Sequence, residues 1–393
     1  NQFSGPLPPG LSTLANLAFL DLAGNQFSGR LIDFTNTTKL IYIDVRFNEF
    51  SGPLPPSIGL LTDLGTAYFG SNNFSGAIPP QVGALGNLVY FDLSGNEFDG
   101  AIPKELANLK SANSISLSGN HLSGPIPKEI AQLTQLQFLD LSFNALTGAI
   151  PPEITAMTGL ADHGSNIAYN GLYTNDANVR AFVNLKTQGG DFEEAQTVMP
   201  TNVRVVETTD RSATLSWDTI RFDYYGGGYQ VAASTTPNGP TVALTTSSSK
   251  SLDRLTIRNL QPATTYYFTV ATVSHPVSDQ RNLITSDRTA AVQGTTKQRV
   301  IAPAEVVMTD TPHGLVQIDG VEVESDSFTL TNFGDVSTAI TLERTENFFT
   351  IAPEQFTLAA GGSQVVTVHS LTQQPGTYYG YVSIDGQGVS DDL

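Results

Sequence analysis

Cysteine is absent from this chain of 393 residues, which excludes a disulfide scaffold, a thiolate metal site and a cysteine nucleophile. No apolar run is long enough to cross a bilayer, so we expect no membrane insertion. Charged residues make up only 14% of the chain, and the 37 acidic residues outnumber the 19 basic ones, for a net charge of −18. Because this charge would repel nucleic acid and anionic membranes, we expect neither as a partner.

Signatures of catalysis and of metal binding are also missing. No HExxH, GxSxG, Walker or dinucleotide-binding motif occurs. The five histidines are scattered singly and lack the spacing of zinc ligands: His121, His163, His275, His313 and His369. The sequence therefore predicts a protein that is not an enzyme and that has no catalytic residues, no metal and no cofactor.

An internal repeat occupies the first half of the chain. Its most regular member is an asparagine that recurs at intervals of 24, 23, 24, 24, 24 and 24 residues, at Asn1, Asn25, Asn48, Asn72, Asn96, Asn120 and Asn144. A ladder of apolar residues precedes each complete repeat's Asn; for Asn25 it consists of Leu11, Leu14, Leu17, Leu20 and Leu22. The last two alternate as on one face of a short strand, whereas the earlier ones recur every third residue, which suits a short helical turn.

The resulting pattern, LxxLxxLxLxxNxFSGxIPxx, resembles the plant-type leucine-rich repeat over residues 1 to about 195. In such a coil the Asn amide satisfies backbone groups that would otherwise be buried without partners. The residues two positions after each Asn should stack into an interior spine: Phe27, Phe50, Phe74, Phe98, Leu122 and Leu146. The segment VRAFVNL follows an Asx-rich start and predicts a short amphipathic helix that caps the array.

From Pro200 the chain changes to alternating β-branched strands separated by turn residues. The stretch ATLSW ends in Trp217, and LQPATTYYFTV places Tyr266 at the spacing of a tyrosine corner. This part resembles a fibronectin type III domain over residues 198–297, which implies that Trp217 fills the sandwich core and that the Tyr266 hydroxyl ties down a corner. No RGD sequence occurs, so the familiar integrin-binding loop is absent.

A third β-rich unit follows KQRVIAPAEV and contains DSFTLTNFGD, AITLER and APEQFTLAAGGS. It resembles the immunoglobulin-like sandwiches of bacterial surface proteins, including the hydin-type group. The fold class we predict is mainly β and multidomain: a leucine-rich repeat solenoid with its C-terminal cap at 1–195, a fibronectin type III domain at 198–297 and an immunoglobulin-like sandwich at 301–393. Because the chain starts with Asn1, partway through a repeat, we expect a piece of a longer protein.

Charge is divided unevenly among these units. Residues 1–195 carry 8 basic and 17 acidic groups, residues 196–299 carry 10 and 7, and residues 300–393 carry 1 and 13. The middle domain is therefore net positive between two negative neighbours. Either the charge serves solubility or it supports electrostatic docking between adjacent domains.

Candidate binding residues follow from the repeat offset, because the positions beside the inward strand leucines should face the concave surface of the solenoid. One column, six residues before each Asn, is largely aromatic, and the next, four before it, is largely acidic. Rings that bury area beside carboxylates that fix orientation could hold a peptide or a sugar chain. The residues we select as a ligand-binding site are Phe19, Asp21, Tyr42, Asp44, Arg46, Tyr68, Tyr90, Asp92, Phe138 and Asp140.

Two alternatives stay open for these acids. Since LDLS is the consensus strand of this repeat class, the Asp column can be consensus alone, without any ligand contact. A hydrolase with a carboxylate pair such as Asp92 and Asp140 needs only two acids, and strand spacing would put these about 9.6 Å apart, which at best suits inversion. No sequence feature would raise the pKa of either acid, so we do not favour catalysis.

The favoured function is non-enzymatic extracellular recognition, in which the concave face binds a protein or peptide. A carbohydrate-binding surface adhesin and a structural spacer of a larger surface protein are the alternatives. Plant receptors with this repeat are typically capped by cysteine pairs, so the lack of cysteine favours a bacterial protein, secreted or at the cell surface. The glycosylation sequons at Asn36 and Asn73 are weak indications of a eukaryotic source, because Asn73 belongs to the repeat consensus.

Overall fold

The computed structural model describes residues 1–277, 280–298, 306–310, 317–318, 325–333, 335–344, 349–370, 376–377 and 382–386. The chain forms two compact units. The first comprises residues 1–206, 214–256 and 267–292, and the second comprises residues 207–213, 257–266 and 293–393, as far as these are described. Among the described residues, no helix combines the length and the apolar character needed to cross a membrane.

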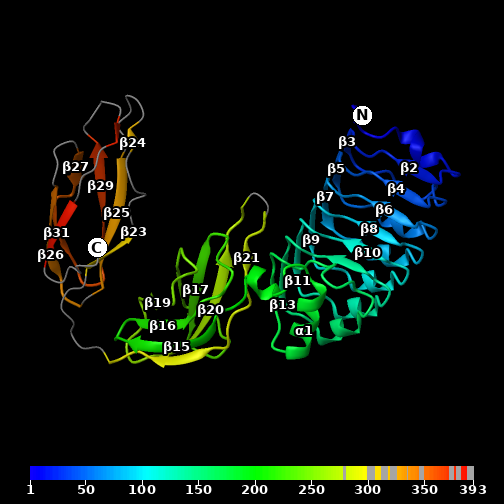
Figure 1. Cartoon of the computed structure of the whole chain (residues 1–393). Helices are drawn as coiled ribbons and strands as arrows, with labels where there is room; N and C mark the ends of the chain where they lie inside the picture. Colours follow the sequence, from blue (N-terminus) through cyan, green and yellow to red (C-terminus); the bar gives the residue numbers. More distant parts are fainter. Residues whose placement is uncertain are drawn as a thin grey trace. The chain divides into compact units, whose positions relative to one another are not determined.

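The repeats stack as successive coils and contribute two parallel sheets (Figure 1). The six-stranded sheet has the order β12-β10-β8-β6-β4-β2, with β2 Phe19–Asp21, β4 Tyr42–Asp44, β6 Thr66–Tyr68, β8 Tyr90–Asp92, β10 Ser114–Ser116 and β12 Phe138–Asp140. The eight-stranded sheet runs β1 Ser4–Gly5, β3 Gln26–Gly29, β5 Glu49–Gly52, β7 Asn73–Ala77, β9 Glu97–Gly100, β11 His121–Gly124, β13 Ala145–Ala149 and β14 Gly171–Tyr173.

Short 3-10 helices complete the coils, as the three-residue spacing of the ladder predicts. They are η1 Pro9–Thr13, η2 Pro56–Leu60, η3 Pro80–Ala84, η4 Lys104–Asn108, η5 Lys128–Gln132 and η6 Pro152–Ala156. Each begins beside the proline of the LPP, IPP or IPK element, which fixes φ at the start of the turn. Gly76, in the FSG element, has a φ of 79°, a conformation that favours glycine.

The asparagine ladder has the structural role predicted for it. Asn96 is fully buried, and its Oδ1 accepts a hydrogen bond from the Phe74 amide of the preceding repeat at 3.0 Å. Its Nδ2 donates to the carbonyls of Phe69, Leu93 and Ser94 at 3.0–3.2 Å. The predicted spine is also present, because the rings of Phe3, Phe27, Phe50, Phe74 and Phe98 stack with centroids 6.0–6.2 Å apart.

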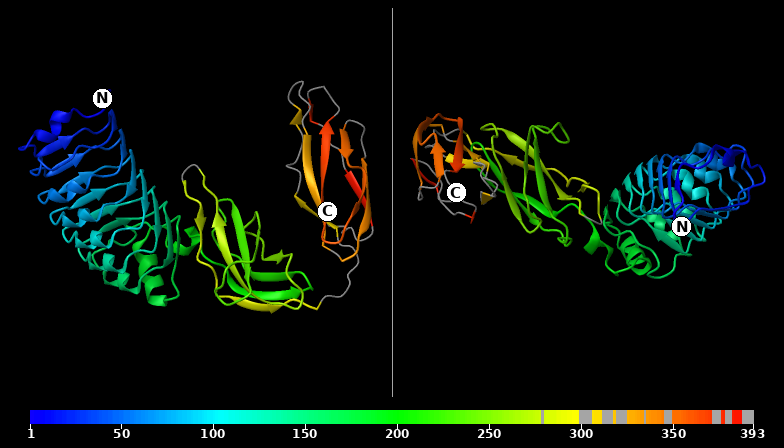
Figure 2. Two further views of the ribbon diagram at one scale, coloured as in Figure 1. Left: turned by 180° about the vertical axis from the view of Figure 1, so that it is seen from behind. Right: turned by 90° about the horizontal axis from the view of Figure 1, so that it is seen from above.

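The predicted cap helix is α1 Ala177–Lys186, followed by η7 Phe192–Ala195. Asp176 caps its N-terminus by accepting from the amides of Asn178 and Val179. Figure 2 shows α1 at the end of the stack opposite the N-terminus. Gln196 adds a further rung to the ladder, since its side chain accepts from the Leu172 amide and donates to the Ile167 carbonyl. The hydrogen bonding of the solenoid thus reaches Gln196, while the predicted domain bounds remain predictions.

The fibronectin-like part contains β15 Thr201–Thr208, β16 Ala213–Asp218, β17 Gly227–Ser234, β18 Ala243–Thr246, β19 Arg254–Ile257, β20 Thr265–Ser274, β21 Ile284–Thr285 and β22 Val292–Thr295. One sheet has the order β15-β16-β19, and β18-β17-β20-β21 belong to the other. Trp217 is buried and packs on Tyr229, with ring centroids 4.9 Å apart. The hydroxyl of buried Tyr266 accepts a hydrogen bond from the Gln261 amide at 2.8 Å, as expected of a tyrosine corner.

The C-terminal strands of the second unit are antiparallel. One sheet has the order β23-β25-β29-β27 and another β28-β26-β31, with bounds β23 Val306–Asp310, β25 Ser325–Asn332, β26 Thr338–Arg344, β27 Phe349–Ala352, β28 Gln355–Leu358, β29 Ser363–Ser370 and β31 Val382–Gly386. A small pair joins β24 Gln317–Ile318 to β30 Gly376–Thr377. Residues of both larger sheets share one apolar core that includes Phe328, Ile340 and Val366. Two layers therefore pack together here, and the immunoglobulin-like family name stays a prediction.

Candidate functional site: the six-stranded sheet of the solenoid

The register of the six-stranded sheet produces the two columns expected from the sequence. Its middle residues are buried, whereas the first and third residues of each strand point to the opposite face. The first column is Phe19, Tyr42, Thr66, Tyr90, Ser114 and Phe138, and the second is Asp21, Asp44, Tyr68, Asp92, Ser116 and Asp140. All ten residues selected from the sequence thus lie on or beside this one sheet.

Four aromatic rings form an unbroken chain across strands β2 to β8. Ring centroids are 6.3 Å apart for Phe19 and Tyr42, 6.4 Å for Tyr42 and Tyr68, and 6.4 Å for Tyr68 and Tyr90. We call these four residues the aromatic chain. Phe19 is 65% exposed and Tyr90 42% exposed, while the two central rings are half-buried. Among the described residues, Phe138 makes no ring contact with this group.

Tyr68 stands in the second column, as expected from the sequence, but its ring plays a different part from the aspartates of that column. It belongs to the acidic column, yet its ring fills the gap that Thr66 leaves in the aromatic column, between Tyr42 and Tyr90. The sequence does contain a signal for this arrangement. In the repeat of Asn72, and in no other of the six, an aromatic residue, Tyr68, stands at the usually acidic position, and Thr66 replaces the usual aromatic one. The four rings therefore lie on four neighbouring strands of the sheet, β2, β4, β6 and β8.

The aspartates of the second column stabilise the turns that follow their strands, besides placing carboxylates on the sheet surface. One carboxylate oxygen of Asp92 accepts from the Ser94 amide at 2.8 Å and from its hydroxyl at 2.6 Å. Asp140 binds Ser142 in the same way, at 2.9 and 2.6 Å. Each aspartate thereby fixes the turn that leaves its strand, which gives the consensus residue a structural purpose. In the described part of the chain, the second oxygen of each makes no hydrogen bond.

Asp44 differs from the other acids because it is only 3% exposed and forms a bidentate ion pair. Arg46 donates to its two oxygens at 2.6–3.2 Å. The same guanidinium lies over the Tyr68 ring, with its central carbon 4.1 Å from the centroid. Asp44 therefore positions Arg46 against the aromatic chain, and direct contact of Asp44 with a ligand remains an untested prediction.

The tyrosines keep their protons under ordinary conditions. Burial raises the pKa of Tyr42, and the charges of Asp44 and Asp21 raise it further. Burial also raises the pKa of Tyr68, although the charge of Arg46 opposes this shift. Both phenols are neutral at pH 7, so they present apolar rings with hydroxyl groups that can donate or accept.

A half-open cavity of about 320 Å³ lies where the sheet meets the cap. Asn166 on its wall pairs in parallel with Asp140, so the cavity continues the acidic column by one coil. The polar side chains on its wall belong to Asn166, Tyr169, Thr187, Gln188, Asp191 and Glu194. Asp191 forms an ion pair with Arg221 at 2.6 Å, and Glu194 supplies the second carboxylate. No sequence pattern had indicated this cavity.

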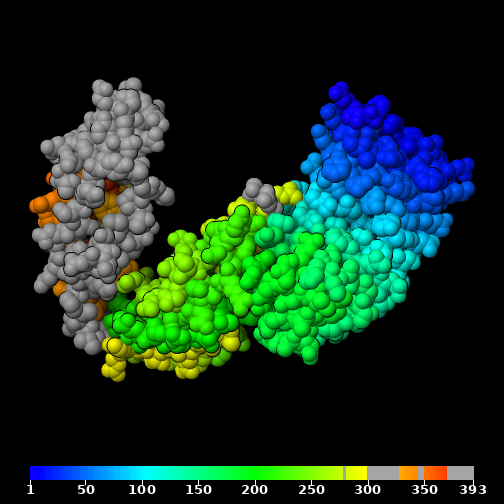
Figure 3. Space-filling view, viewed as in Figure 1, coloured from blue at the N-terminus to red at the C-terminus, as the bar shows by residue number. Residues whose placement is uncertain are grey.

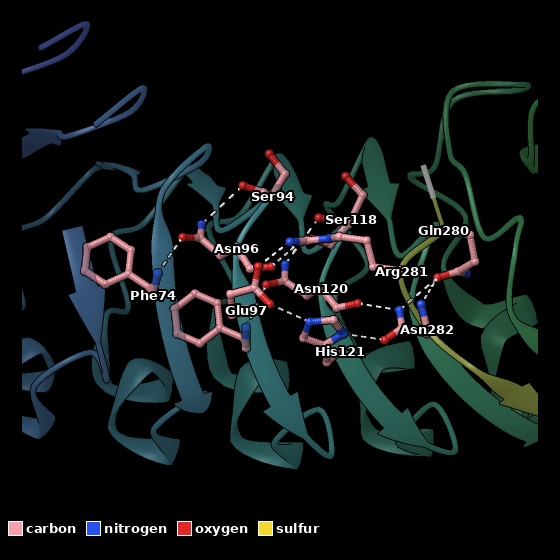
Figure 4. Close-up of polar contacts among 12 residues, drawn as sticks. Phe74, Ser94, Asn96, Glu97, Ser118, Asn120, His121, Gln280, Arg281 and Asn282 are labelled. Atoms are coloured by element: carbon pink, nitrogen blue, oxygen red, sulfur yellow. Dashed lines mark hydrogen bonds and ion pairs between the residues drawn. The ribbon is translucent and has the colours of Figure 1, made fainter. Parts of the chain in front are cut away.

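A second polar cluster, also missed by the sequence reasoning, lies on the eight-stranded sheet (Figure 4). Three consecutive residues of the fibronectin-like part, Gln280, Arg281 and Asn282, contact the ladder of the repeats; we call them the QRN segment. Arg281 donates to the carbonyls of Asn96 at 2.7 Å and Gly119 at 3.1 Å, and it pairs with the Glu97 carboxylate. Yellow atoms of this part of the chain lie against the solenoid surface in Figure 3.

Asn282 and Gln280 bind the same ladder further along. Asn282 donates to the Asn120 carbonyl at 2.7 Å, and Gln280 donates to the carbonyls of Asn144 at 3.2 Å and Tyr169 at 2.6 Å. The three side chains thus reach carbonyls of successive coils. Arg281 forms an ion pair with Glu97, and Arg221 forms one with Asp191. Both pairs join a basic residue of the middle domain to an acidic residue of the solenoid, which agrees with the alternative that the uneven charge supports docking between adjacent domains.

No cluster of three or more metal-ligating side chains occurs among the described residues, a part of the chain that does not include His313. Asp92 and Asp140 are the two acids of the hydrolase alternative. They stand two strands apart in the register, with Ser116 between them, as expected from the sequence.

Comparisons with known families identify two of the three parts. Residues 87–109, 111–133 and 135–157 match the family model described as Leucine Rich Repeat, and residues 199–285 match the Fibronectin type III domain. No curated protein sequence matches the chain.

Solved structures similar to the chain include two plant receptors. The LRR ectodomain of the receptor kinase GASSHO1/SCHENGEN3 from Arabidopsis thaliana, in complex with CASPARIAN STRIP INTEGRITY FACTOR 2, is 35% identical over 44% of this chain and 20% of its own, with a TM-score of 0.42. The Arabidopsis receptor kinase HAESA, in complex with the peptide hormone IDA and the co-receptor SERK1, is 33% identical over 51% and 33%, with a TM-score of 0.45.

A plant ice-binding protein is 26% identical over 50% of this chain and 60% of its own, with a TM-score of 0.41. The chain spans only 20% and 33% of the length of the two receptor chains. The family matches and the two parallel sheets agree with each other. This chain carries leucine-rich repeats that form a solenoid, followed by a fibronectin type III domain.

Proposed function

We propose that the solenoid recognises a protein or peptide partner on its six-stranded sheet, with the ligand lying across the strands. The observation that carries this proposal is the aromatic chain, four rings in continuous contact on a sheet face. Exposed aromatic residues gathered in one patch are uncommon on soluble surfaces unless they bind something, and Tyr is enriched at the centres of interfaces.

The spacing of the rings suits an extended peptide. An extended strand rises about 3.3 Å per residue, so every second side chain recurs at about 6.6 Å. The ring centroids are 6.3–6.4 Å apart, which lets alternate side chains of one peptide each meet the space between neighbouring rings. Apolar or aromatic residues at every second position would bury the most area there.

Ring orientation favours a peptide over a sugar chain. The planes of neighbouring rings are inclined at 35°, 89° and 42°, so they do not form one flat platform. Stacked pyranose rings would need aromatic faces turned the same way, whereas peptide side chains pack well against both edges and faces. A carbohydrate ligand is therefore the second candidate, and the structural-spacer function is the third.

The charges beside the aromatic chain predict where the charged side chains of a partner would bind along the sheet. Arg46 places one cation against Tyr68, and Asp21, Asp92 and Asp140 place carboxylates along the second column. The acids outnumber the base, so a partner with basic side chains toward β8 and β12 fits best. The cavity beside Asp140 could receive one such side chain at the end of the ligand. Binding should weaken as salt rises, because exposed carboxylates are screened.

The proposal also includes the location of the protein. Repeats and a fibronectin type III domain joined in one chain suit a recognition module outside the cell or at its surface, and we propose that location without catalytic activity. A bacterial source remains our proposal from the absence of cysteine.

A peptide-display selection tests the proposal without knowledge of the natural partner. A library of random dodecapeptides is selected on the full chain, and the dissociation constant of the best binder is measured for the parent and for Tyr42→Ala/Tyr68→Ala/Tyr90→Ala. Each truncation should cost about 1–2 kcal/mol, so the triple variant should bind at least a hundredfold more weakly. Enriched peptides should carry apolar residues at alternate positions.

Tyr224→Ala is the matched control, since Tyr224 is an exposed aromatic residue that lies outside the six-stranded sheet. It should change affinity by less than threefold. Equal binding of the triple variant and the parent, with both folded by circular dichroism, would show that the aromatic chain is not the site. If the library yields no peptide binder and a glycan array yields a ligand, the carbohydrate alternative would be favoured.

A further inference from the structure

His121, on β11, is bound through both ring nitrogens at the contact between the eight-stranded sheet and the QRN segment (Figure 4). Its Nε2 lies 2.5 Å from a carboxylate oxygen of Glu97. Its Nδ1 contacts the side-chain oxygen of Asn282. The protonation state of the ring therefore depends on which way the Asn282 amide is turned.

Main-chain carbonyls fix the direction of that amide. Gln280 uses its NH2 group on the carbonyls of Asn144 and Tyr169, so its side-chain oxygen must be the acceptor that faces Asn282. The Asn282 NH2 group donates to this oxygen at 2.9 Å and to the Asn120 carbonyl at 2.7 Å. Since both of these partners can only accept, the Asn282 oxygen is the atom turned toward His121.

Both partners of His121 are consequently acceptors. A neutral imidazole has one N–H donor, whereas the imidazolium has two. Only the charged ring can donate to the Glu97 carboxylate and the Asn282 oxygen at the same time. The contact as a whole thus requires a protonated histidine.

We propose that the QRN segment is a pH-responsive latch, which holds residues 281–284 of the fibronectin type III domain on the repeats when His121 is protonated and loosens when His121 loses its proton. Docking takes up a proton, so it is stronger at lower pH and weaker at higher pH. Histidine is the side chain whose charge ordinarily changes between pH 5 and 8. The neutral ring can donate to only one of the two, so either the Glu97 carboxylate or the Asn282 oxygen loses its histidine donor, while Glu97 keeps its pairing with Arg281.

The charged groups around His121 do not change over that range. Partial burial tends to raise the pKa of Glu97, but hydrogen bonding with His121 and the charge and hydrogen bond of Arg281 outweigh it, and the pKa falls below its usual value. Arg281 is always charged. Asp99, the neighbour of His121 in the sheet register, is the remaining acid on β9. On the other side, β13 pairs with β11 through the uncharged residues Ala145 and Leu146. His121 is therefore the group that can switch.

Only the contact of residues 281–284 should loosen. Gln280 keeps its two carbonyl partners, and Thr197 still meets Ser274 through their hydroxyls at 2.6 Å. These contacts contain no group that titrates near neutrality. The latch should accordingly change the opening of residues 281–284 without releasing the whole domain.

Hydrogen exchange of the full chain, read by mass spectrometry at pH 5.5 and 8.0 and corrected for intrinsic rates, tests the latch. Protection of backbone amides in residues 280–285 should fall by roughly tenfold or more between the two pH values, since a hydrogen bond with a charged group is lost. His121→Gln should show the low protection at both pH values. Asn282→Asp should move the fall to higher pH, because a second carboxylate favours the imidazolium.

His163→Gln is the matched control, because His163 contacts a main-chain carbonyl in the solenoid and lies away from the QRN segment. It should retain the parent's pH dependence. A parent whose protection at 280–285 does not change with pH would overturn the proposal, as would a His121→Gln variant that keeps the parent's response. Nitrogen NMR of His121 gives a second reading, and a neutral tautomer at pH 5.5 would also refute the latch.

Discussion

Asn96 shows how one side chain can hold two successive coils together. Its amide contacts Phe74 and Phe69 in one direction and Leu93 within its own repeat, all of them main-chain groups. Asparagine suits the position because it combines one acceptor and two donors on a short stem. An aspartate could not donate, and a glutamine would be one methylene longer.

Replacing Asn96 by Ala should lower the free energy of unfolding by about 1–3 kcal/mol, because buried main-chain groups lose their partners. Thermal or urea unfolding would measure the loss. Asn73→Ala, at an exposed position in the neighbouring strand, is the control and should change stability by less than about 0.5 kcal/mol. Equal stability of the Asn96 variant and the parent would remove the structural role from the ladder.

Lys250 is the opposite case, a charged group that its surroundings do not accommodate. The residue is 4% exposed, and its Nζ lies 4.6 Å from the centroid of the Phe222 ring. Within the part of the chain that the structure describes, this Nζ has no hydrogen-bond partner. Burial lowers the pKa of Lys250 to about 8, with the charge of Asp223 opposing the shift. The folded protein therefore binds this proton less tightly than the unfolded chain, whose lysine has a pKa near 10.5.

Stability should consequently rise with pH between about 8 and 10.5, and the full penalty should be present below pH 8. Lys250→Met should raise the free energy of unfolding at pH 7 by about 1–3 kcal/mol and flatten its rise between pH 7 and 9.5. Urea unfolding at several pH values measures both effects. Lys104→Met, at an exposed site, is the control. A Lys250 variant less stable than the parent at pH 7 would mean that the cation–π contact outweighs burial.

At the scale of elements, the repeat was the most predictable part of the molecule. The ladder, the asparagine spacing and the proline element fix strand, 3-10 helix and turn in most coils, because these coils repeat the same local choices. The coil between β3 and β4 has no proline element and forms no 3-10 helix. The cap helix α1 could be predicted from Asp176 and the apolar residues after it. Trp217 and Tyr266 identified the fibronectin type III domain for a similar reason, since both serve its core and corner directly.

The elements that sequence reasoning missed depend on neighbours far along the chain. Gln196 completes the ladder 26 residues after Asn170, yet it breaks the asparagine pattern and so carried no signal. The QRN segment lies between β20 and β21 and has no periodicity. Most of its partners are main-chain carbonyls, which no side-chain pattern can reveal, and Glu97 and His121 are its side-chain partners on the repeats. The columns of the site could be predicted from the register, whereas the aromatic chain required the positions of the rings themselves.

At the scale of the molecule, the solenoid and the fibronectin type III domain share an apolar cluster besides the QRN segment. Tyr169 of the last coil stacks on Phe143 at 4.3 Å and also meets Phe222 and Tyr225, at 6.0 and 5.6 Å between centroids. Buried Ile220 belongs to the same cluster. Shared burial of this kind couples the unfolding of two domains, because either one exposes the cluster when it opens.

Removing the shared ring should therefore separate the two unfolding events. We expect the parent's solenoid and fibronectin type III domain to melt in one calorimetric transition, and Tyr169→Ala combined with Arg281→Ala to split it in two, at a loss of about 2 kcal/mol or more from buried aromatic area. Tyr224→Ala, which removes a ring that is 81% exposed, is the control and should leave one transition. Two separate transitions in the parent would show that the cluster does not couple the domains, and that each is stable without the other.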